Sequence, residues 1–362
     1  MSTTRFLPFA ALTMTTLALA ACGSDANATG SAATAAPSVS CPSGTLQAEG
    51  SSAQKNAIEA AIASFQNACT GMTVNYNPTG SGAGIKQFLA GQVDFAGSDS
   101  ALKAEEAAAA EKRCGAPAWD LPMVAGPIAI AYNLPGVPKL VLSAEVAGKI
   151  FAGRITAWND PAIAALNAGV ALPNDPIMVY FRSDESGTTD NFQKYLKAAA
   201  GPSWGLEAGK KWNGPIGEGK TKSAGVAGAV KAQLGGLTYV EWSYARQNGL
   251  GVAWVDNGGG PVELTGTSVG AMIAGAKQKG TGNDLALDLD YATTAPGAYP
   301  INLVTYEIVC STYSDAAKRA AVTAFLKHFA SADVQGKLAE LGYAPLPATV
   351  ADKVGAALDA IG

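Results

Sequence analysis

Short apolar runs rich in β-branched residues alternate with helix-like runs along most of the chain after residue 40. Alternation of this kind is typical of α/β proteins whose sheets are largely parallel. No internal repeat and no long linker interrupts the pattern, so two domains within 362 residues would be joined by short crossovers. Strands are predicted at 45–50, 72–76, 93–97, 127–133, 176–181, 236–240 and 301–309, and helices at 54–69, 83–91 and 103–113, with a mostly helical end at 314–341.

The composition is that of a globular protein, with 48% hydrophobic and 15% charged residues. The formal net charge is −4 and the chain has no long basic run, so no nucleic-acid partner is expected. An acidic protein can still bind an anion where hydrogen-bond donors and helix dipoles converge locally. The net charge therefore leaves an anion-binding function open.

The first 22 residues have the pattern of a lipoprotein signal peptide. Arg5 precedes an apolar stretch at 6–21, and the small residues before Cys22 resemble the lipobox of bacterial lipoproteins, which predicts lipidation of Cys22. Residues 23–40 are small and polar without periodicity, as expected of a flexible tether. The alternatives are an ordinary signal peptide with a chance cysteine, or a short membrane anchor. No other stretch is long and apolar enough to span a bilayer.

Four cysteines follow Cys22, and export permits them to form disulfides. Four cysteines allow three pairings, which the sequence alone does not decide. Cys41 precedes a predicted strand and Cys69 ends the helix that follows, so a helix running back along its strand would bring them together. We therefore favour Cys41–Cys69 and, by elimination, Cys114–Cys310. None of them has CxxC spacing, so no metal or redox role is expected.

Two features that could indicate an enzyme have simpler explanations. His328 is the only histidine, and its partly apolar helical setting favours a packing or surface role over a catalytic triad or metal site. The segment GPIGEGKT at 214–221 matches the phosphate-loop pattern, but the residues before it are polar and not strand-like. We interpret 214–221 as a lid or surface loop before a helix.

Three predicted strand-to-helix turns carry small hydroxyl residues at the start of the helix. Helix N-termini offer free N–H groups and a positive dipole to an anion, although serine and threonine are also the usual helix caps. Such turns cluster at one edge of a parallel sheet, so three together indicate an oxyanion pocket better than any one alone. The residues are Ser51 and Ser52 in the first turn, Ser81 among glycines in the second, and Arg182, Ser186 and Thr188 in the third.

Asp99 follows another predicted strand, at a place where a carboxylate would repel a fully ionised anion. Its simplest explanation is a helix N-cap. Alternatively, a carboxylate can accept a hydrogen bond from the P–OH group of phosphate, whereas sulfate has no such proton near neutral pH. Asp99 would then select a protonated oxyanion over sulfate.

Five segments, in this order and spacing, resemble the extracytoplasmic phosphate-binding proteins of bacterial ABC phosphate importers. The resemblance covers roughly residues 44–347 and implies a two-lobed fold of the periplasmic-binding-protein type II class. Two mixed, largely parallel sheets flanked by helices would form lobes at 41–124 plus 298–362 and at 125–297, with the ligand cleft between them. The segments are GSGAGIKQFLAGQVDFAGSDSAL, IFAGRITAWNDPAI, RSDESGTTDNFQKYL, LTYVEWSYARQNGL and GYAPLP.

The same resemblance implies which residues bind phosphate. Asp99 matches the proton-accepting aspartate of the family, and Arg182 matches its arginine, with Asp184 orienting the guanidinium. The chain departs from some relatives at Ala53, where they carry phenylalanine and where only the backbone N–H is needed. It also departs at Glu185, an extra acid that we expect to face solvent. The implied phosphate-binding set is Ser52, Ala53, Ser81, Asp99, Arg182, Ser186, Gly187 and Thr188.

The resemblance implies a monomeric phosphate receptor outside the cytoplasmic membrane, held there by a lipid on Cys22. It would deliver inorganic phosphate to the transmembrane permease subunits of an ABC importer, without enzymatic activity, cofactor or metal. Three alternatives remain. They are a receptor for another tetrahedral oxyanion such as sulfate, a secreted phosphatase on the same scaffold, and a surface adhesin that has lost its ligand.

Overall fold

A computed structural model describes residues 41–362 of the chain. The predictions of a signal peptide at 1–22, a tether at 23–40 and a lipid on Cys22 lie outside the described residues. Within 41–362, no helix is both long enough and apolar enough to cross a membrane.

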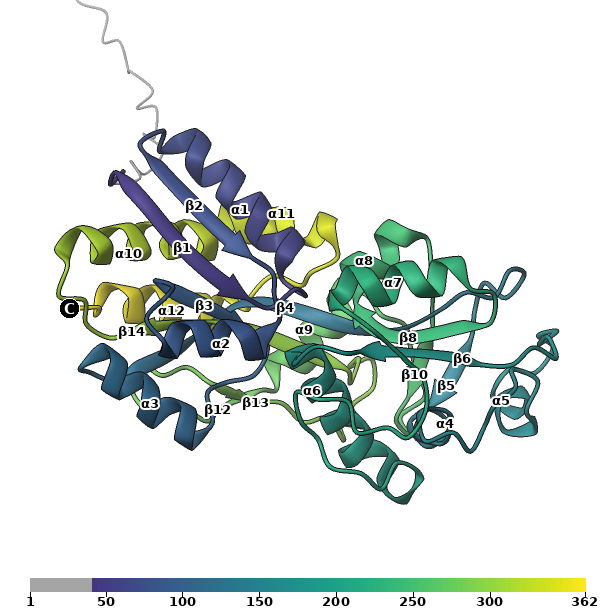
Figure 1. Ribbon diagram of the computed structural model, residues 1–362. Coiled ribbons are helices and arrows are strands. Elements are labelled where there is room, and N and C mark those ends of the chain that lie inside the picture. The colour runs from purple at the N-terminus through teal and green to yellow at the C-terminus, as the bar shows by residue number, and fades with distance from the viewer. Residues whose placement is uncertain (1–40) are drawn as a thin grey trace, which may run out of the picture. The chain divides into compact units, whose positions relative to one another are not determined.

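Nine strands form one mixed sheet (Figure 1). They are β1 (Gly44–Gly50), β2 (Met72–Asn77), β3 (Phe95–Ser98), β4 (Ala118–Tyr132), β6 (Met178–Arg182), β7 (Glu218–Lys220), β8 (Gly236–Glu241), β9 (Gly251–Val252) and β14 (Asn302–Cys310). Their order is β2-β1-β3-β14-β4-β8-β6-β7, with β9 also paired to β4. The pairs toward both ends, around β1 and around β6, are parallel. Those in the middle, through β14 and β4, are antiparallel.

The long strand β4 connects the two parallel parts of this sheet. Its first part, Ala118–Pro127, pairs with β14, and its second part, Ile128–Tyr132, pairs with β8. All of its side chains from Asp120 onward are buried, as expected of a strand covered on both faces. The sequence predicts a strand at 127–133 within the apolar run LPMVAGPIAIAYN at 121–133, and the structure extends this strand back to Ala118.

Helices flank the sheet. They include α1 (Lys55–Ala68), α2 (Ser81–Leu89), α3 (Ala104–Cys114), α6 (Gly187–Tyr195), α7 (Lys222–Ala232), α10 (Ala316–Ala330), α11 (Ala332–Leu341) and α12 (Ala348–Asp359). In Figure 1, α1 and α10 lie near β1 and β2, with α12 against α10 and β4, whereas α7 and α8 (Trp242–Asn248) lie near β8. The predicted helices within this set are confirmed with small shifts at their ends, and α12 was not predicted.

Three clusters of buried apolar residues are present within residues 41–362, and the two largest correspond to these two groups of elements. One joins β1, β2, α1 and α10, and its centre includes Phe65, Phe95 and Phe325, whose rings pack against one another. The other joins the second part of β4 to β8 and α6, with Phe192 stacked on Tyr239 at a ring-centroid distance of 4.6 Å. Burial of apolar surface on this scale is the main stabilising contribution to such a fold.

Shorter elements complete the chain. The strands β5, β10 and β11 form a small sheet, and β12 and β13 form a hairpin-like pair. Their bounds are β5 (Val141–Ser143), α4 (Ala144–Phe151), α5 (Pro161–Leu166), a π-helix (Leu196–Ala200), a 3₁₀ turn (Gly201–Ser203), β10 (Trp254–Asp256), β11 (Pro261–Val262), α9 (Gly266–Ala274), β12 (Lys277–Gln278) and β13 (Leu287–Asp288).

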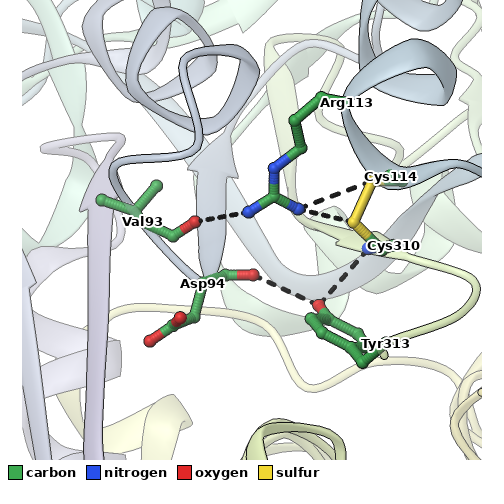
Figure 2. Close-up of a disulfide and its surroundings, with 6 residues drawn as sticks. All are labelled: Val93, Asp94, Arg113, Cys114, Cys310 and Tyr313. Carbon is green, nitrogen blue, oxygen red and sulfur yellow. Dashed lines mark hydrogen bonds between the residues drawn. A yellow bond between two sulfur atoms is a disulfide. The ribbon is translucent and has the colours of Figure 1, made fainter. Parts of the chain in front are cut away.

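Two disulfides are present, Cys41–Cys69 and Cys114–Cys310, so both predicted pairings are confirmed. The first closes a separation of 28 residues and the second a separation of 196. Figure 2 shows the guanidinium of Arg113 beside the second disulfide, where it also donates to the carbonyl oxygen of Val93 at 2.9 Å. This disulfide ties the end of α3 to the end of β14.

His328 has the packing role predicted from its helical setting. On α10, its Nε2 lies 2.7 Å from the hydroxyl of Ser64 and its ring lies 5.4 Å from that of Phe65. Burial lowers the pKa of His328, so the neutral imidazole is favoured.

Candidate functional site

The three predicted turns and the loop after β3 come together in a set of buried, hydrogen-bonded side chains. We refer to this set as the polar cluster. Each side chain in it is at most 2% exposed. The cluster consists of Ser51, Ser52, Ser81, Asp99, Arg182, Thr188, Ser223 and Thr305, together with the backbone of Gly187.

The first turn follows β1 at Gly50, which lies against the backbone of the next strand. A Cβ atom at Gly50 would lie 1.9 Å from the carbonyl oxygen of Gly97, and the φ of Gly50 is +151°, so a side chain is excluded there. Ser51 N–H donates to that same oxygen at 2.8 Å. The turn thus places the hydroxyls of Ser51 and Ser52 immediately before α1.

The backbone N–H of Ala53 is already used within this turn. It donates to the hydroxyl of Ser51 at 3.0 Å. The predicted donation from Ala53 to a ligand would therefore replace or share this local bond. Ala53 itself is fully buried, and its carbonyl oxygen accepts from the hydroxyl of Tyr343 at 2.7 Å.

The second turn places Ser81 at the first residue of α2, next to the third turn. The Ser81 hydroxyl accepts from the backbone N–H of Gly187 at 3.1 Å and from that of Asp99 at 3.2 Å. Gly187 is the first residue of α6, and a Cβ atom there would lie 2.6 Å from the Cβ of Asp99 and 2.7 Å from the Ser81 hydroxyl. The amino ends of two helices and the loop after β3 therefore meet at one hydroxyl oxygen.

Asp99 is the acid of the polar cluster and is 2% exposed. Its Oδ1 accepts from the hydroxyl of Thr305 at 2.8 Å. Its Oδ2 accepts at longer distances, from Thr188 at 3.3 Å and from Ser81 at 3.5 Å. Burial raises the pKa of Asp99, while the hydroxyls of Ser51, Thr305 and Thr188 and the charge of Arg182 act in the opposite direction. Oδ2 is thus the oxygen with capacity for a stronger donor.

Arg182 is the cation of the polar cluster and is also 2% exposed. It ends β6, and its Nε donates to Asp184 at 2.8 Å while Nη2 bonds the other oxygen of the same carboxylate. This two-point contact fixes the plane of the guanidinium and leaves Nη1, which donates to Ser223 at 3.2 Å. Burial alone would raise the pKa of Asp184, but the hydrogen bonds and charge of Arg182 hold it below its usual value. The orienting role predicted for Asp184 fits this geometry.

Ser186 lies at the N-cap of α6, and its hydroxyl accepts from the N–H of Thr189 at 3.3 Å. The capping interpretation of Ser186 is therefore confirmed, and its hydroxyl proton remains available to an acceptor. Thr188 is the second residue of α6, and its hydroxyl donates to Asp99 instead. Glu185 pairs with Lys86 at 2.6 Å and Lys211 at 3.5 Å, with 28% of its side chain exposed, so it is not part of the cluster.

Ser223 belongs to the polar cluster but was not predicted from the sequence. Its hydroxyl lies 3.0 Å from that of Ser52, and its N–H donates to the same oxygen at 3.2 Å. It lies at the start of α7, just after the segment 214–221, whose interpretation as a loop is wrong in part. Residues Glu218–Lys220 form the edge strand β7, and the next helix reaches the site. The missed signal is a hydroxyl residue at a helix start, as in the other three turns.

Residues of helix α8 form hydrogen bonds to the first turn and to α1. Tyr244 donates to the carbonyl oxygen of Ser52 at 2.8 Å. The hydroxyl of Ser243 accepts from the side-chain amide of Asn56 on α1 at 2.8 Å. These contacts stabilise the backbone position from which Ser51 and Ser52 present their hydroxyls.

Comparison with known proteins identifies the family. Residues 34–333 match the PBP superfamily domain. The phosphate-binding protein PstS 3 of Mycobacterium tuberculosis (strain ATCC 25618 / H37Rv) is 50% identical over 353 residues, which cover 95% of each chain. The chain belongs to the PstS family of phosphate-binding proteins. A more distant family member, the phosphate-binding protein PstS of Pasteurella multocida, is 35% identical over 307 residues, or 82% of this chain and 85% of its own.

Solved structures related to this PstS-family chain agree on the fold. The periplasmic phosphate-binding protein PfluDING, solved with phosphate bound, has a TM-score of 0.72 at 23% identity, covering 86% of this chain and 93% of its own. A phosphate-binding protein from Stenotrophomonas maltophilia has a TM-score of 0.65 at 21% identity, with the same coverage. The predicted two-lobed α/β binding-protein fold is thereby confirmed.

Proposed function

We propose that this PstS-family protein binds inorganic phosphate in the polar cluster, outside the cytoplasmic membrane, and delivers it to an ABC importer. The observation that carries the proposal is the pairing of one buried guanidinium, Arg182, with one buried carboxylate, Asp99, among several hydroxyl and N–H donors. Phosphate near neutral pH carries negative charge and at least one proton. It therefore needs both an array of donors and one acceptor.

Asp99 supplies the acceptor. A P–OH group would donate to Oδ2, the oxygen whose present donors are 3.3 and 3.5 Å away. Sulfate would bring an unprotonated oxygen against the same carboxylate, and this repulsion would discriminate against it. We therefore favour phosphate over the sulfate-like alternative.

Arg182 and the surrounding donors would hold the remaining oxygens. The candidates from the sequence, Ser52, Ser81, Ser186 and Thr188 with the backbone of Ala53 and Gly187, all lie at helix starts or in the first turn, and Ser223 joins them. Hydrogen bonds to a charged group contribute roughly 1.5–3 kcal/mol each. Binding also costs free energy, because the ligand and the side chains around it lose freedom of motion. A few hydrogen bonds beyond those that offset this cost suffice for micromolar affinity, which corresponds to about −8 kcal/mol.

We further propose the predicted lobe boundaries, 41–124 plus 298–362 and 125–297. The change of partner along β4 after Pro127 supports a division close to these boundaries. The hydrogen bond from the Gly187 N–H to the Ser81 hydroxyl and the one between the hydroxyls of Ser52 and Ser223 would then cross between the lobes. These bonds would break when the lobes open to admit phosphate and to release it to the permease.

The remaining parts of the proposal concern the setting of the protein. A lipid on Cys22 would anchor a monomer to the membrane through the tether at 23–40. We assign no catalytic step to the polar cluster, because its guanidinium is held by Asp184 and its carboxylate by hydroxyl groups. The phosphatase alternative would need a base for nucleophile activation, and His328 lies against Ser64 and Phe65 instead.

Calorimetric titration of the ligand-free protein with phosphate and then with sulfate tests this function. We expect one phosphate per chain with micromolar or tighter affinity, and no heat from sulfate. A folded, verified ligand-free sample that gives no heat with phosphate would contradict the proposal. Steady release of phosphate from a generic phosphoester would favour the phosphatase instead.

A further inference from the structure

Glu307 lies in the middle of β14, and its side chain has no hydrogen-bond partner within residues 41–362. Its side chain is 0% exposed, and neither carboxylate oxygen receives a donor. One other buried atom in its surroundings is in the same situation, the side-chain oxygen Oε1 of Gln54. Two buried acceptors without donors are costly, at about 1–3 kcal/mol each, so their coincidence requires an explanation.

The two side chains meet at one level of the sheet, Glu307 from β14 and Gln54 from the turn between β1 and α1. Glu307 pairs in register with Gly97 of β3. A Cβ atom at Gly97 would lie 2.1 Å from Nε2 of Gln54, so the glutamine side chain lies directly over Gly97. The missing side chain at Gly97 therefore lets Gln54 extend across β3 beside Glu307.

The orientation of the Gln54 amide follows from its other contact. Its Nε2 lies 2.9 Å from the hydroxyl of Tyr76, and that hydroxyl donates its only proton to the carbonyl oxygen of Ser51 at 2.8 Å. Tyr76 can therefore accept from Gln54 but cannot donate to it, which requires Nε2 to face Tyr76. The amide oxygen Oε1 of Gln54 is therefore the atom that could accept a hydrogen bond from Glu307.

We infer that Glu307 is a neutral carboxylic acid that donates its proton to Gln54 Oε1 and so positions the first anion-binding turn. One proton satisfies both buried acceptors. It completes a chain of hydrogen bonds from Glu307 through Gln54 and Tyr76 to the backbone of Ser51. The inference rests on the proposed function, because it assigns Glu307 a positioning role for the residues that would bind phosphate.

The charges around Glu307 agree with a neutral acid. Burial raises its pKa to about 8, the charge of Asp99 acts in the same direction, and the contact with Gln54 acts in the opposite direction. Tyr76 is the other titratable group that faces it, and burial raises the pKa of Tyr76 well above its usual value, so it stays neutral. Among the described residues, no cation acts on Glu307 as Arg182 acts on Asp184. An ionised Glu307 would add a second buried negative charge next to Asp99.

Infrared difference spectroscopy on the full chain tests the protonation state without reference to any ligand. The spectrum of the wild type minus that of Glu307→Gln at neutral pH should contain the carbonyl band of a protonated carboxylic acid. The band should fade as the pH rises above about 8. Glu59→Gln, which removes an exposed carboxylate on α1, is the matched control and should give no such band. The absence of the band from the Glu307→Gln difference would overturn the inference.

Phosphate titrations of two variants test the positioning role. Glu307→Gln retains a donor for Gln54 Oε1, so its Kd should stay within about twofold of the wild type. Glu307→Leu has no donor and should weaken phosphate binding by roughly three- to tenfold, the equivalent of one neutral hydrogen bond. Equal affinities of the two variants, with both folded by circular dichroism, would overturn the positioning role. If the wild type itself does not bind phosphate, the proposed function fails while the infrared band still decides the state of Glu307.

Discussion

The hydroxyl oxygen of Ser81 lies 3.1 Å from the backbone nitrogen of Gly187, although the two residues are 106 positions apart in the chain. This one contact joins the first residue of α2 to the first residue of α6. Both helices direct N–H groups of their first turns toward the same place, where Asp99 and Arg182 also lie. The contact requires glycine at 187, because any side chain there would overlap Asp99 and Ser81.

Gly187→Ala should therefore weaken phosphate binding strongly. The added methyl group would separate α6 from Ser81 and Asp99, and we expect at least a tenfold rise in Kd by calorimetry. Gly228→Ala on α7 is the matched control, since a Cβ atom at Gly228 meets nothing within 4 Å. An unchanged Kd for Gly187→Ala would mean that the two helix ends do not act together on the ligand.

Asp99→Asn should admit sulfate while phosphate binding stays measurable. The amide can donate to an unprotonated oxygen, which the carboxylate cannot do. It can also still accept from Thr305. Competition of phosphate and sulfate for the variant provides the measurement. If sulfate binding stays undetectable, Asp99 is not the residue that excludes sulfate.

Arg182→Ala should weaken phosphate binding at least tenfold. The substitution removes the buried cation and leaves the Asp184 carboxylate without its partner, which adds repulsion toward an anion. Arg319→Ala, which removes an exposed guanidinium from α10, is the control for net charge. A Kd equal to that of the wild type would place Arg182 outside the binding site.

Asp120→Asn should reduce the pH dependence of stability. Burial and the nearby charge of Asp284 raise the pKa of Asp120 to about 8 from the usual 3.8. The folded protein therefore binds this proton more tightly than the unfolded chain does. The protonation of Asp120 contributes fully to the free energy of unfolding at a pH below the pKa that Asp120 has in the unfolded chain. This contribution is lost as the pH rises toward 8. The amide keeps an acceptor for the N–H of Leu102, so the fold should tolerate it.

Urea unfolding across this pH interval checks the prediction for Asp120. One titrating group contributes at most about 1.4 kcal/mol per pH unit to the free energy of unfolding. The variant should show a shallower decline than the wild type between about pH 5 and pH 8. A residual slope is expected, because burial also raises the pKa of Glu241 and Glu307 to about 8. Identical slopes would show that Asp120 is ionised throughout.

Local signals account for the parts of the site that the sequence could predict. Ser81 and Ser186 stand at helix starts, where the change from a strand pattern to a helix pattern is visible over a few residues. Their grouping around Asp99 follows from the rule that such turns share one edge of a sheet. Arg182 precedes the third of these helix starts, and the resemblance to a known family adds Asp184 as its orienting partner.

The residues that the sequence did not predict depend on tertiary contacts. Thr305 is one polar residue within the buried strand β14, and nothing local distinguishes its role from packing. Ser223 follows Lys222, whose φ of +65° is unusual for a residue other than glycine. The N–H of Lys222 donates to Asp184, a residue 38 positions earlier, at 2.8 Å. A turn of this kind cannot be recognised without its partner, so the start of α7 was placed on the surface.

A crystal structure of the protein with bound phosphate tests the central claim most directly. The account predicts phosphate within the polar cluster, with its oxygens at hydrogen-bond distances of about 3 Å from Arg182 and Ser81 and with one oxygen against Oδ2 of Asp99. Phosphate bound at another place on the chain, with Asp99 and Arg182 still held by their present partners, would contradict it.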